Sequence, residues 1–252
     1  MLFMKYSNKH NLPKSLYDAI VNDQYDFKND KDKFSVTTLI SPPKIVQLKI
    51  RHDSEIVEDI SDMIWILLGQ SVHSIMERID DNEDRVIERR LNEKIGNATV
   101  SGKIDLYEDG VIQDYKVTSV YTIIYHPRGK KEWIEQQNIY AWLYRKAGFN
   151  VEGLKILAIF RDFSKSKSKF TKNYPKIPCQ TIDLPLWEME ETEELIKEKV
   201  ALQRKYQDMP DDEIPCCEKE DRWAKDVRCN EYCSVNKFCN YYRDNIDKKD
   251  NL

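Results

Sequence analysis

The chain has 252 residues, of which 40% are hydrophobic and 11% aromatic, and this is enough to build a globular core. The formal net charge of −4 argues against a surface that is basic throughout, although a chain that is acidic overall can still line one groove with basic groups. No apolar run reaches the ~18–20 residues of a membrane span and the N-terminus lacks a signal-peptide pattern, so we expect a cytoplasmic protein with no membrane partner.

The first third of the chain predicts helices. Residues 1–35 are mostly polar and indicate an extension with one short helix near residues 16–21. A short apolar segment at residues 35–40 precedes two prolines that open a helix through about His52. Apolar residues at helical spacing over residues 56–79 then predict a long buried helix.

The middle of the chain predicts a mixed α/β core. Its expected elements are three antiparallel strands at residues 86–91, 99–107 and 111–119, a helix at 133–147 that ends at Gly148, and a buried strand at 154–160.

The remaining sequence changes in character. Residues 164–169 alternate serine and lysine and predict a solvated basic loop, and the alternative is a loop that contacts phosphates. An alternating segment at residues 179–184 and a charged helix at residues 186–207 follow. The last forty residues contain five of the six cysteines.

Two carboxylates and a lysine are concentrated around an expected hairpin. Asp105 precedes an Asp-Gly turn, and Asp114 and Lys116 follow it on one face of the returning strand. These residues are consistent with a salt-bridged turn or with a metal site. The metal site gains support from the apolar surroundings of Asp114, where an unpaired carboxylate is costly.

Polar side chains also recur on the two long helices. Gly69, His73 and Glu77 are four residues apart and share one helix face. A single buried histidine is more often a hydrogen-bonded core residue than a ligand. On the second helix, Gln137 and Tyr140 lie three residues apart and face the same way.

Four short motifs in this order resemble the RecB-like branch of the PD-(D/E)XK nucleases over about residues 36–163. The motifs are Gly-x-x-x-His, Gly-x-x-Asp, Asp-Tyr-Lys and Gln-x-x-Tyr. The matching residues are Gly69 and His73, Gly102 and Asp105, Asp114 and Lys116, and Gln137 and Tyr140.

The resemblance implies a restriction-endonuclease-like α/β fold, a mixed sheet flanked by helices, with one or two Mg²⁺ or Mn²⁺ ions. It implies that His73, Asp105, Asp114 and the Tyr115 carbonyl bind the metal, and an imidazole among the ligands favours Mn²⁺. Lys116 would orient or activate water. By the same resemblance, Gln137 and Tyr140 support the site or contact DNA. Glu88 and Glu77 are candidate accessory carboxylates, although a surface glutamate is the commoner case for Glu88.

The function implied by the resemblance is cleavage of DNA, most often as an exonuclease on ends or single strands. Relatives of this branch act in recombination, repair, phage DNA metabolism or CRISPR adaptation, in bacterial or phage-infected cells, so a recombination or CRISPR adaptation protein is a candidate partner. The alternative is a catalytically silent DNA-binding or assembly module, which would have no need of intact Asp105, Asp114 and Lys116.

The cysteine cluster predicts a second metal site of four thiolates. Cys229, Cys233 and Cys239 would be joined by Cys216 or Cys217. Several RecB-like nucleases, including AddB-type subunits, have a [4Fe–4S] cluster here, and this slightly favours an iron–sulfur cluster over Zn²⁺. The chain departs from that pattern because no cysteine precedes Cys179.

These observations together predict three parts. Residues 1–35 form an N-terminal extension, residues 36–185 a nuclease core, and residues 186–252 a C-terminal helix with a metal-clamped, Cys-rich subdomain.

Overall fold

The computed structural model describes residues 5–22, 31–79 and 85–247, and the other parts of the expected N-terminal extension lie outside this range. The chain divides into two compact units, residues 66–197 and residues 1–65 together with 198–252. The domain boundaries expected above remain a prediction. None of the described helices is long and apolar enough to cross a membrane.

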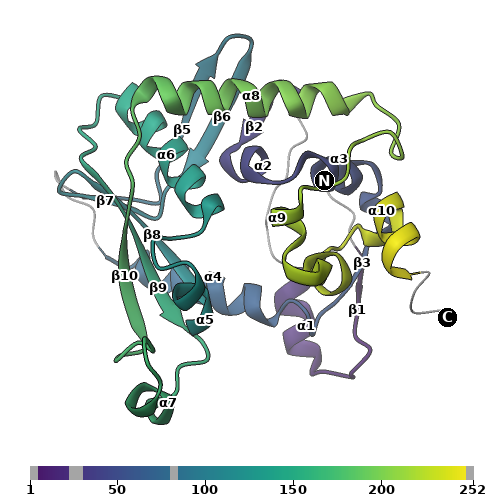
Figure 1. The fold of residues 1–252 in the computed structure, drawn as a ribbon, viewed down its shortest axis with the longest axis horizontal. Coiled ribbons are helices and arrows are strands. Elements are labelled where there is room, and N and C mark those ends of the chain that lie inside the picture. The colour runs from purple at the N-terminus through teal and green to yellow at the C-terminus, as the bar shows by residue number, and fades with distance from the viewer. Residues whose placement is uncertain (1–4, 23–30, 80–84, 248–252) are drawn as a thin grey trace. The chain divides into compact units, whose positions relative to one another are not determined.

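Residues 66–197 are built on a five-stranded mixed sheet (Figure 1). β8 (Val111–Thr118) and β9 (Gly153–Phe160) are parallel, and the other neighbouring strands are antiparallel. A parallel pair needs a long crossover, which α5 (Val120–Tyr125) and α6 (Lys131–Lys146) supply between β8 and β9. The predicted fold class, a mixed sheet flanked by helices, is confirmed. The strand order is β10 (Cys179–Leu184), β9 (Gly153–Phe160), β8 (Val111–Thr118), β7 (Leu106–Glu108) and β4 (Arg85–Ile87).

The turn between β7 and β8 is the predicted hairpin. Asp109 and Gly110 both have positive φ, 49° and 78°, as a two-residue type I′ turn requires. The expected strand over residues 99–107 is wrong in one respect, because it is broken at Ile104 and Asp105. The segment up to the break is β6 (Ala98–Lys103), which pairs with β5 (Arg90–Ile95) in a separate hairpin.

The long helix α6 packs on β5, β6, β8 and β9. It forms as expected, and Gly148 with φ of 91° follows its C-terminus. Gly102 on β6 permits the close approach, because an added Cβ would lie 2.6 Å from Leu143 Cδ1 and 2.8 Å from Tyr140 Cε1.

The prediction of one buried helix over residues 56–79 is wrong. Residues 57–59 form β3 (Val57–Asp59), paired with β1 (Lys5–Ser7), and α4 (Ile64–Met76) begins five residues later. The Asp59 carboxylate accepts hydrogen bonds from Ser7 Oγ, Lys9 N and Ser61 N, which hold the chain in a turn instead of a helix. No residue of α4 is buried, and Ile75 is 55% exposed.

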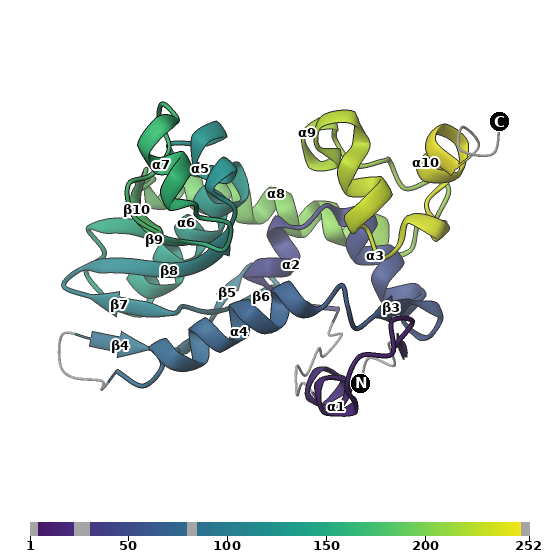
Figure 2. The ribbon, with the colours of Figure 1, turned by 90° about the horizontal axis from the view of Figure 1, so that it is seen from below.

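The basic loop expected at residues 164–169 is also wrong, because this segment forms the short helix α7 (Lys165–Phe170). Ser164 is its N-cap, and the Ser164 hydroxyl accepts a hydrogen bond from Lys167 N at 3.3 Å. Figure 2 shows α7 beside α5.

The other unit is mainly helical. Arg51, the last residue of α3 (Pro43–Arg51), donates to the Tyr206, Gln207 and Met209 carbonyls at the end of α8 (Met189–Gln207). Lys44 is buried and donates to the Ile214 carbonyl and to Asn240 Oδ1, each at 2.7 Å. Besides β1 and β3, its elements before the tail include α1 (Lys14–Val21), β2 (Lys33–Ser35), α2 (Val36–Ile40), α3 (Pro43–Arg51), η1 (Asp53–Glu55) and the C-terminal part of α8 (Met189–Gln207).

The C-terminal tail consists of short helical segments. It packs on α3 through a small apolar cluster in which Val235 meets Leu48 and Ile56. The tail segments are α9 (Lys219–Arg222), η2 (Ala224–Asp226), η3 (Arg228–Tyr232), η4 (Asn236–Phe238), α10 (Asn240–Tyr242) and η5 (Arg243–Asp247).

Candidate metal centre

Two paired strands are interrupted at the same point, and this interruption brings Glu88 and Asp105 together. β4 pairs with β7 and β5 pairs with β6 in one continuous antiparallel register, so Glu88 lies opposite Asp105 at the break. The Glu88 N–H donates to the Asp105 carbonyl at 3.2 Å. Glu88 has φ of 51°, a costly conformation for a residue with a side chain, and such strain concentrates at functional sites.

His73 on α4 completes this group. Its Nδ1 atom lies 3.3 Å from Asp105 Oδ1, and its ring meets the Tyr115 ring edge-on at 6.1 Å. One ligand atom from each of His73, Glu88 and Asp105 falls within 4.8 Å of the others. The hydrogen bond to Asp105 raises the pKa of His73, although partial burial opposes the shift.

Asp114 and Lys116 project from the same face of β8, as predicted. The Lys116 ammonium lies 2.7 Å from Asp114 Oδ2. Asp114 is only 4% exposed, and burial raises its pKa to about 6 although Lys116 opposes the change. Asp105 raises the Asp114 pKa further and His73 lowers it, so the four groups share one electrostatic site.

The glutamine that contacts this site is Gln136. Its Oε1 accepts from Lys116 Nζ at 3.1 Å, and its Nε2 donates to Tyr140 Oη at 3.2 Å. Sequence reasoning chose Tyr140 and Gln137 and missed Gln136. Gln137 is fully buried, and neither atom of its amide has a hydrogen-bond partner within the described residues.

Tyr115 and Glu77, two other candidates from the sequence, differ in how they relate to the site. The Tyr115 N–H donates to Asp105 Oδ2 at 2.8 Å, which orients the carboxylate, and Tyr115 as a ligand through its carbonyl remains a prediction. Glu77 is exposed beyond the end of α4 and is not among the residues that gather around Asp105.

The His73–Glu88–Asp105 group fits a divalent metal. Two ligands on opposite sides of an ion at about 2.1 Å stand about 4.2 Å apart, close to the observed spread of 4.8 Å. The donors are one imidazole nitrogen and two carboxylates, a set that suits Mn²⁺ and also Mg²⁺. Glu88 also forms an ion pair with Lys103, so a cationic partner is already accommodated at this carboxylate.

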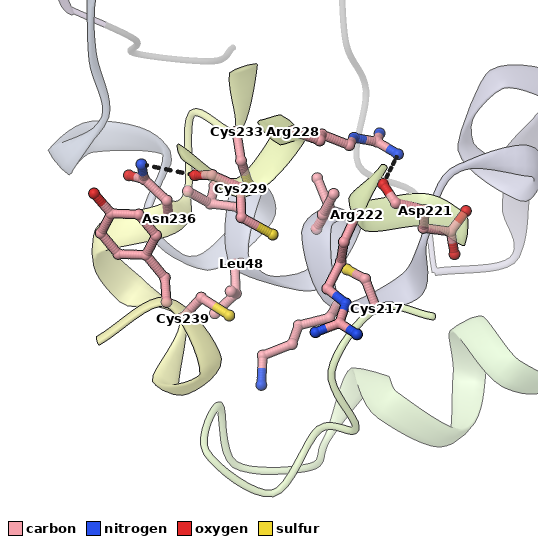
Figure 3. Close-up of a pocket in the computed structure, with 13 residues that line it drawn as sticks. Leu48, Cys217, Asp221, Arg222, Arg228, Cys229, Cys233, Asn236 and Cys239 are labelled. Carbon is pink, nitrogen blue, oxygen red and sulfur yellow. Dashed lines mark hydrogen bonds between the residues drawn. The ribbon is translucent and has the colours of Figure 1, made fainter. Parts of the chain in front are cut away.

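Four of the five cysteines of the tail line a cavity beside α3. Cys217, Cys229, Cys233 and Cys239 all border it, and the sulfur atoms of Cys217, Cys229 and Cys239 point into it (Figure 3). Cys216 is exposed. Burial, followed by the neighbouring Cys233 and Cys239, raises the pKa of Cys217 to about 12, and burial raises the pKa of Cys229 to about 11.

Comparison with known proteins supports the fold. No protein-family model matches the chain, and no curated protein is similar to it in sequence. The crystal structure of SSO0001 is 16% identical, with a TM-score of 0.51, and covers 91% of this chain and 93% of that chain. This likeness shows the fold and not the activity.

Two further structures are similar at lower scores. A phage related exonuclease from Haemophilus somnus 129PT is 16% identical with a TM-score of 0.33, over 77% of this chain and 80% of that chain. A protein named as an exonuclease from Eubacterium rectale is 12% identical with a TM-score of 0.35, over 78% of this chain and 76% of that chain.

Proposed function

We propose that the protein is a divalent-metal-dependent deoxyribonuclease. The observation that carries the proposal is the meeting of His73, Glu88 and Asp105 within 4.8 Å, in one electrostatic site with the Asp114–Lys116 ion pair. Glu88 and Asp114 have lysine partners, Lys103 and Lys116, and a divalent cation would balance the charge of the whole group, Asp105 included.

In this proposal His73, Asp105 and Asp114 hold the metal, with Glu88 as a further carboxylate and the Tyr115 carbonyl as a further oxygen. A bound divalent ion lowers the pKa of its water and neutralises charge on a phosphate. The chain's own groups do the positioning. The Tyr115 N–H orients Asp105, and Asp114 and Gln136 together hold the Lys116 ammonium where it can donate to a water or to a phosphate oxygen.

The finer parts of the proposal come from the family resemblance. We infer exonuclease action on DNA ends or single strands, in recombination, repair, phage DNA metabolism or CRISPR adaptation. We also infer that Cys217, Cys229, Cys233 and Cys239 hold a structural [4Fe–4S] cluster or Zn²⁺, because these four thiols border one cavity and Cys216 is exposed.

The test is digestion of end-labelled single-stranded and duplex DNA by the whole protein with Mn²⁺, with Mg²⁺ and with chelator. We expect cleavage with either metal and none with chelator. Asp105→Asn should lose activity by about 100-fold or more, because it removes a ligand charge and the partner of His73. Cleavage that continues in chelator would contradict the proposal, and so would a wild-type protein that binds DNA without cutting it.

A further inference from the structure

Two exposed tyrosines stack on each other immediately after the strand that carries Asp114 and Lys116. Val120 and Ile123 bury one face of α5, which leaves Tyr121 and Tyr125 on the other face at i,i+4 spacing. Their rings are stacked, with centroids 6.3 Å apart and planes 26° apart, and they are 43% and 74% exposed. Adjacent exposed aromatic rings are typical of surfaces that bind a partner.

The helix α7 adds positive charge to the same surface. Lys167 Nζ lies 5.6 Å from the centre of the Tyr121 ring and 3.4 Å from Tyr121 Oη. Phe170 follows on the same helix face and is 84% exposed. Lys165 and Lys169 are exposed on the same short helix. We call Tyr121, Tyr125, Lys167 and Phe170 the aromatic–basic platform.

Hydrogen bonds fix the starts of the two helices that carry the platform. The Asp162 carboxylate accepts from Ser119 Oγ at 2.6 Å and from Val120 N at 2.7 Å. The buried Tyr174 hydroxyl accepts from Ser164 N and donates to the Asp162 carbonyl, at 2.9 and 3.3 Å. The carboxylate is therefore engaged by the start of α5, and the exposed side of the platform carries rings and ammonium groups.

We propose that this platform binds single-stranded DNA, with bases stacked on Tyr121 and Tyr125 and phosphates contacted by Lys167 and its neighbouring lysines. Stacked aromatic rings beside lysines match single strands, whose bases are unpaired and whose backbone is anionic. A duplex buries its base faces and offers the rings nothing to stack on. The chain from Lys116 to Tyr121 spans at most about 18 Å, so a strand on the platform lies within a few nucleotides of the metal centre. The inference deepens the proposed function and rests on it for the identity of the polymer as DNA.

The test is equilibrium binding of a fluorescent oligothymidylate to the whole protein in buffer without Mn²⁺ or Mg²⁺. Tyr125→Ala should weaken binding at least about fivefold, and Tyr125→Trp should preserve it, because stacking needs a ring and not a hydroxyl. Tyr232→Ala is the matched control, since Tyr232 is 63% exposed but lies on the tail, and it should bind as wild type.

Two further arms separate stacking from charge. An oligomer of the same length without bases should bind more weakly than oligothymidylate, and its affinity should not respond to Tyr125→Ala. Lys167→Gln should reduce the slope of log affinity against log salt by about 0.7, whereas Lys94→Gln, an exposed lysine on β5, should not.

The inference is overturned if wild type does not bind the oligomer, if Tyr125→Ala binds as wild type, or if the base-free strand binds as well as oligothymidylate. These outcomes differ from failure of the proposed function. A protein that binds through the platform but does not cut with Mn²⁺ contradicts the nuclease and leaves the platform standing. A protein that cuts single strands as well after Tyr125→Ala contradicts the platform alone.

Discussion

Two adjacent glutamines on α6 have opposite surroundings. Gln136 bridges Lys116 and Tyr140, whereas the Gln137 amide is buried with neither atom hydrogen-bonded within the described residues. We expect Gln136→Met to lower nuclease turnover by about tenfold, because Lys116 loses a partner that positions it. Gln137→Met should keep turnover and leave stability equal or higher, since an apolar side chain replaces an unpaired amide.

The measurement is turnover with Mn²⁺ together with chemical unfolding of both variants. If Gln137→Met loses turnover while Gln136→Met keeps the wild-type turnover, Gln137 is the functional glutamine, as the sequence motif predicts. This pair therefore decides whether the motif or the observed contact identifies the functional glutamine.

Glu88 shows what residue-level sequence reasoning missed. It was expected as an accessory carboxylate at most, yet it lies opposite Asp105 across the break. A signal existed, because Gly96-Asn97 forms a two-residue turn between Ile95 and Ala98. Counting outward from that turn pairs Glu88 with Asp105. The interruption between β6 and β7 could not be predicted, because the alternation of apolar and polar residues does not mark it.

At the scale of single elements, two glycines predicted to matter differ in what surrounds them. An added Cβ at Gly102 would collide with Leu143 and Tyr140 of α6, while nothing lies within 4 Å of the same position at Gly69 on α4. We expect Gly102→Ala to cost about 1–3 kcal/mol of unfolding free energy. Gly69→Ala should gain roughly 0.5–1 kcal/mol from helix propensity.

Urea unfolding of both variants measures the difference. Equal stability of Gly102→Ala and wild type would show that α6 does not sit as close to β6 as the structure places it. A loss of stability in Gly69→Ala would show that α4 is packed at a position that is open here.

The end of α3 carries a pH-dependent contact. His52 stacks on Phe238 with ring centres 4.0 Å apart and hydrogen-bonds Asp211 and Glu55, each at 2.7 Å. Burial lowers the pKa of His52, but the two carboxylates outweigh it and the net shift is upward. A raised pKa stabilises the fold fully below the unfolded value of about 6.5, and this contribution is lost as the pH rises through the folded value.

Stability should therefore fall as the pH rises above about 6.5, and by more in wild type than in His52→Phe, which keeps the stacking and removes the titration. The pKa of Asp211 is lowered by its hydrogen bonds to His52 and Arg51 in spite of burial, so its own contribution is lost only in acid, below about pH 4. Thermal unfolding across this range measures the effect. An identical pH dependence in both proteins would contradict the assignment.

The elements that sequence predicted best are those with a complete local signal. The Asp109-Gly110 hairpin, the helix ended by Gly148 and the strand β9 formed as expected. The helix expected over residues 56–79 failed because the apolar spacing runs through Asp59, whose side-chain hydrogen bonds to residues 7 and 9 come from far along the chain. The start of α7 depends on the N-cap Ser164. Because serine and lysine alternate through this segment, its composition does not show which serine caps a helix.

On the scale of the whole molecule, the protein joins a candidate catalytic unit to a helical unit that contains five of the six cysteines. Sequence predicted the fold class, and it named His73, Glu88 and Asp105, which the structure brings together, as candidate site residues. It could not choose between Cys216 and Cys217, because the choice depends on which sulfur faces the cavity beside α3.

Cys217→Ser should therefore lose bound metal and lower the melting temperature by several degrees, because a metal that binds only the folded tail stabilises it. Cys216→Ser is the matched control and should retain both. Metal analysis and absorption near 400 nm of anaerobically purified protein identify the ion. Metal loss in Cys216→Ser with full loading of Cys217→Ser would reverse the assignment.

The central claim is that Asp114 and its neighbours form a metal-dependent nuclease site, and Mn²⁺-dependent digestion of end-labelled single-stranded DNA tests it most directly. Asp183, exposed on β10 of the same sheet, is the matched control. We predict that Asp114→Asn lowers the cleavage rate by about 100-fold or more while Asp183→Asn cuts at the wild-type rate. Cleavage by Asp114→Asn at the rate of Asp183→Asn would contradict the account.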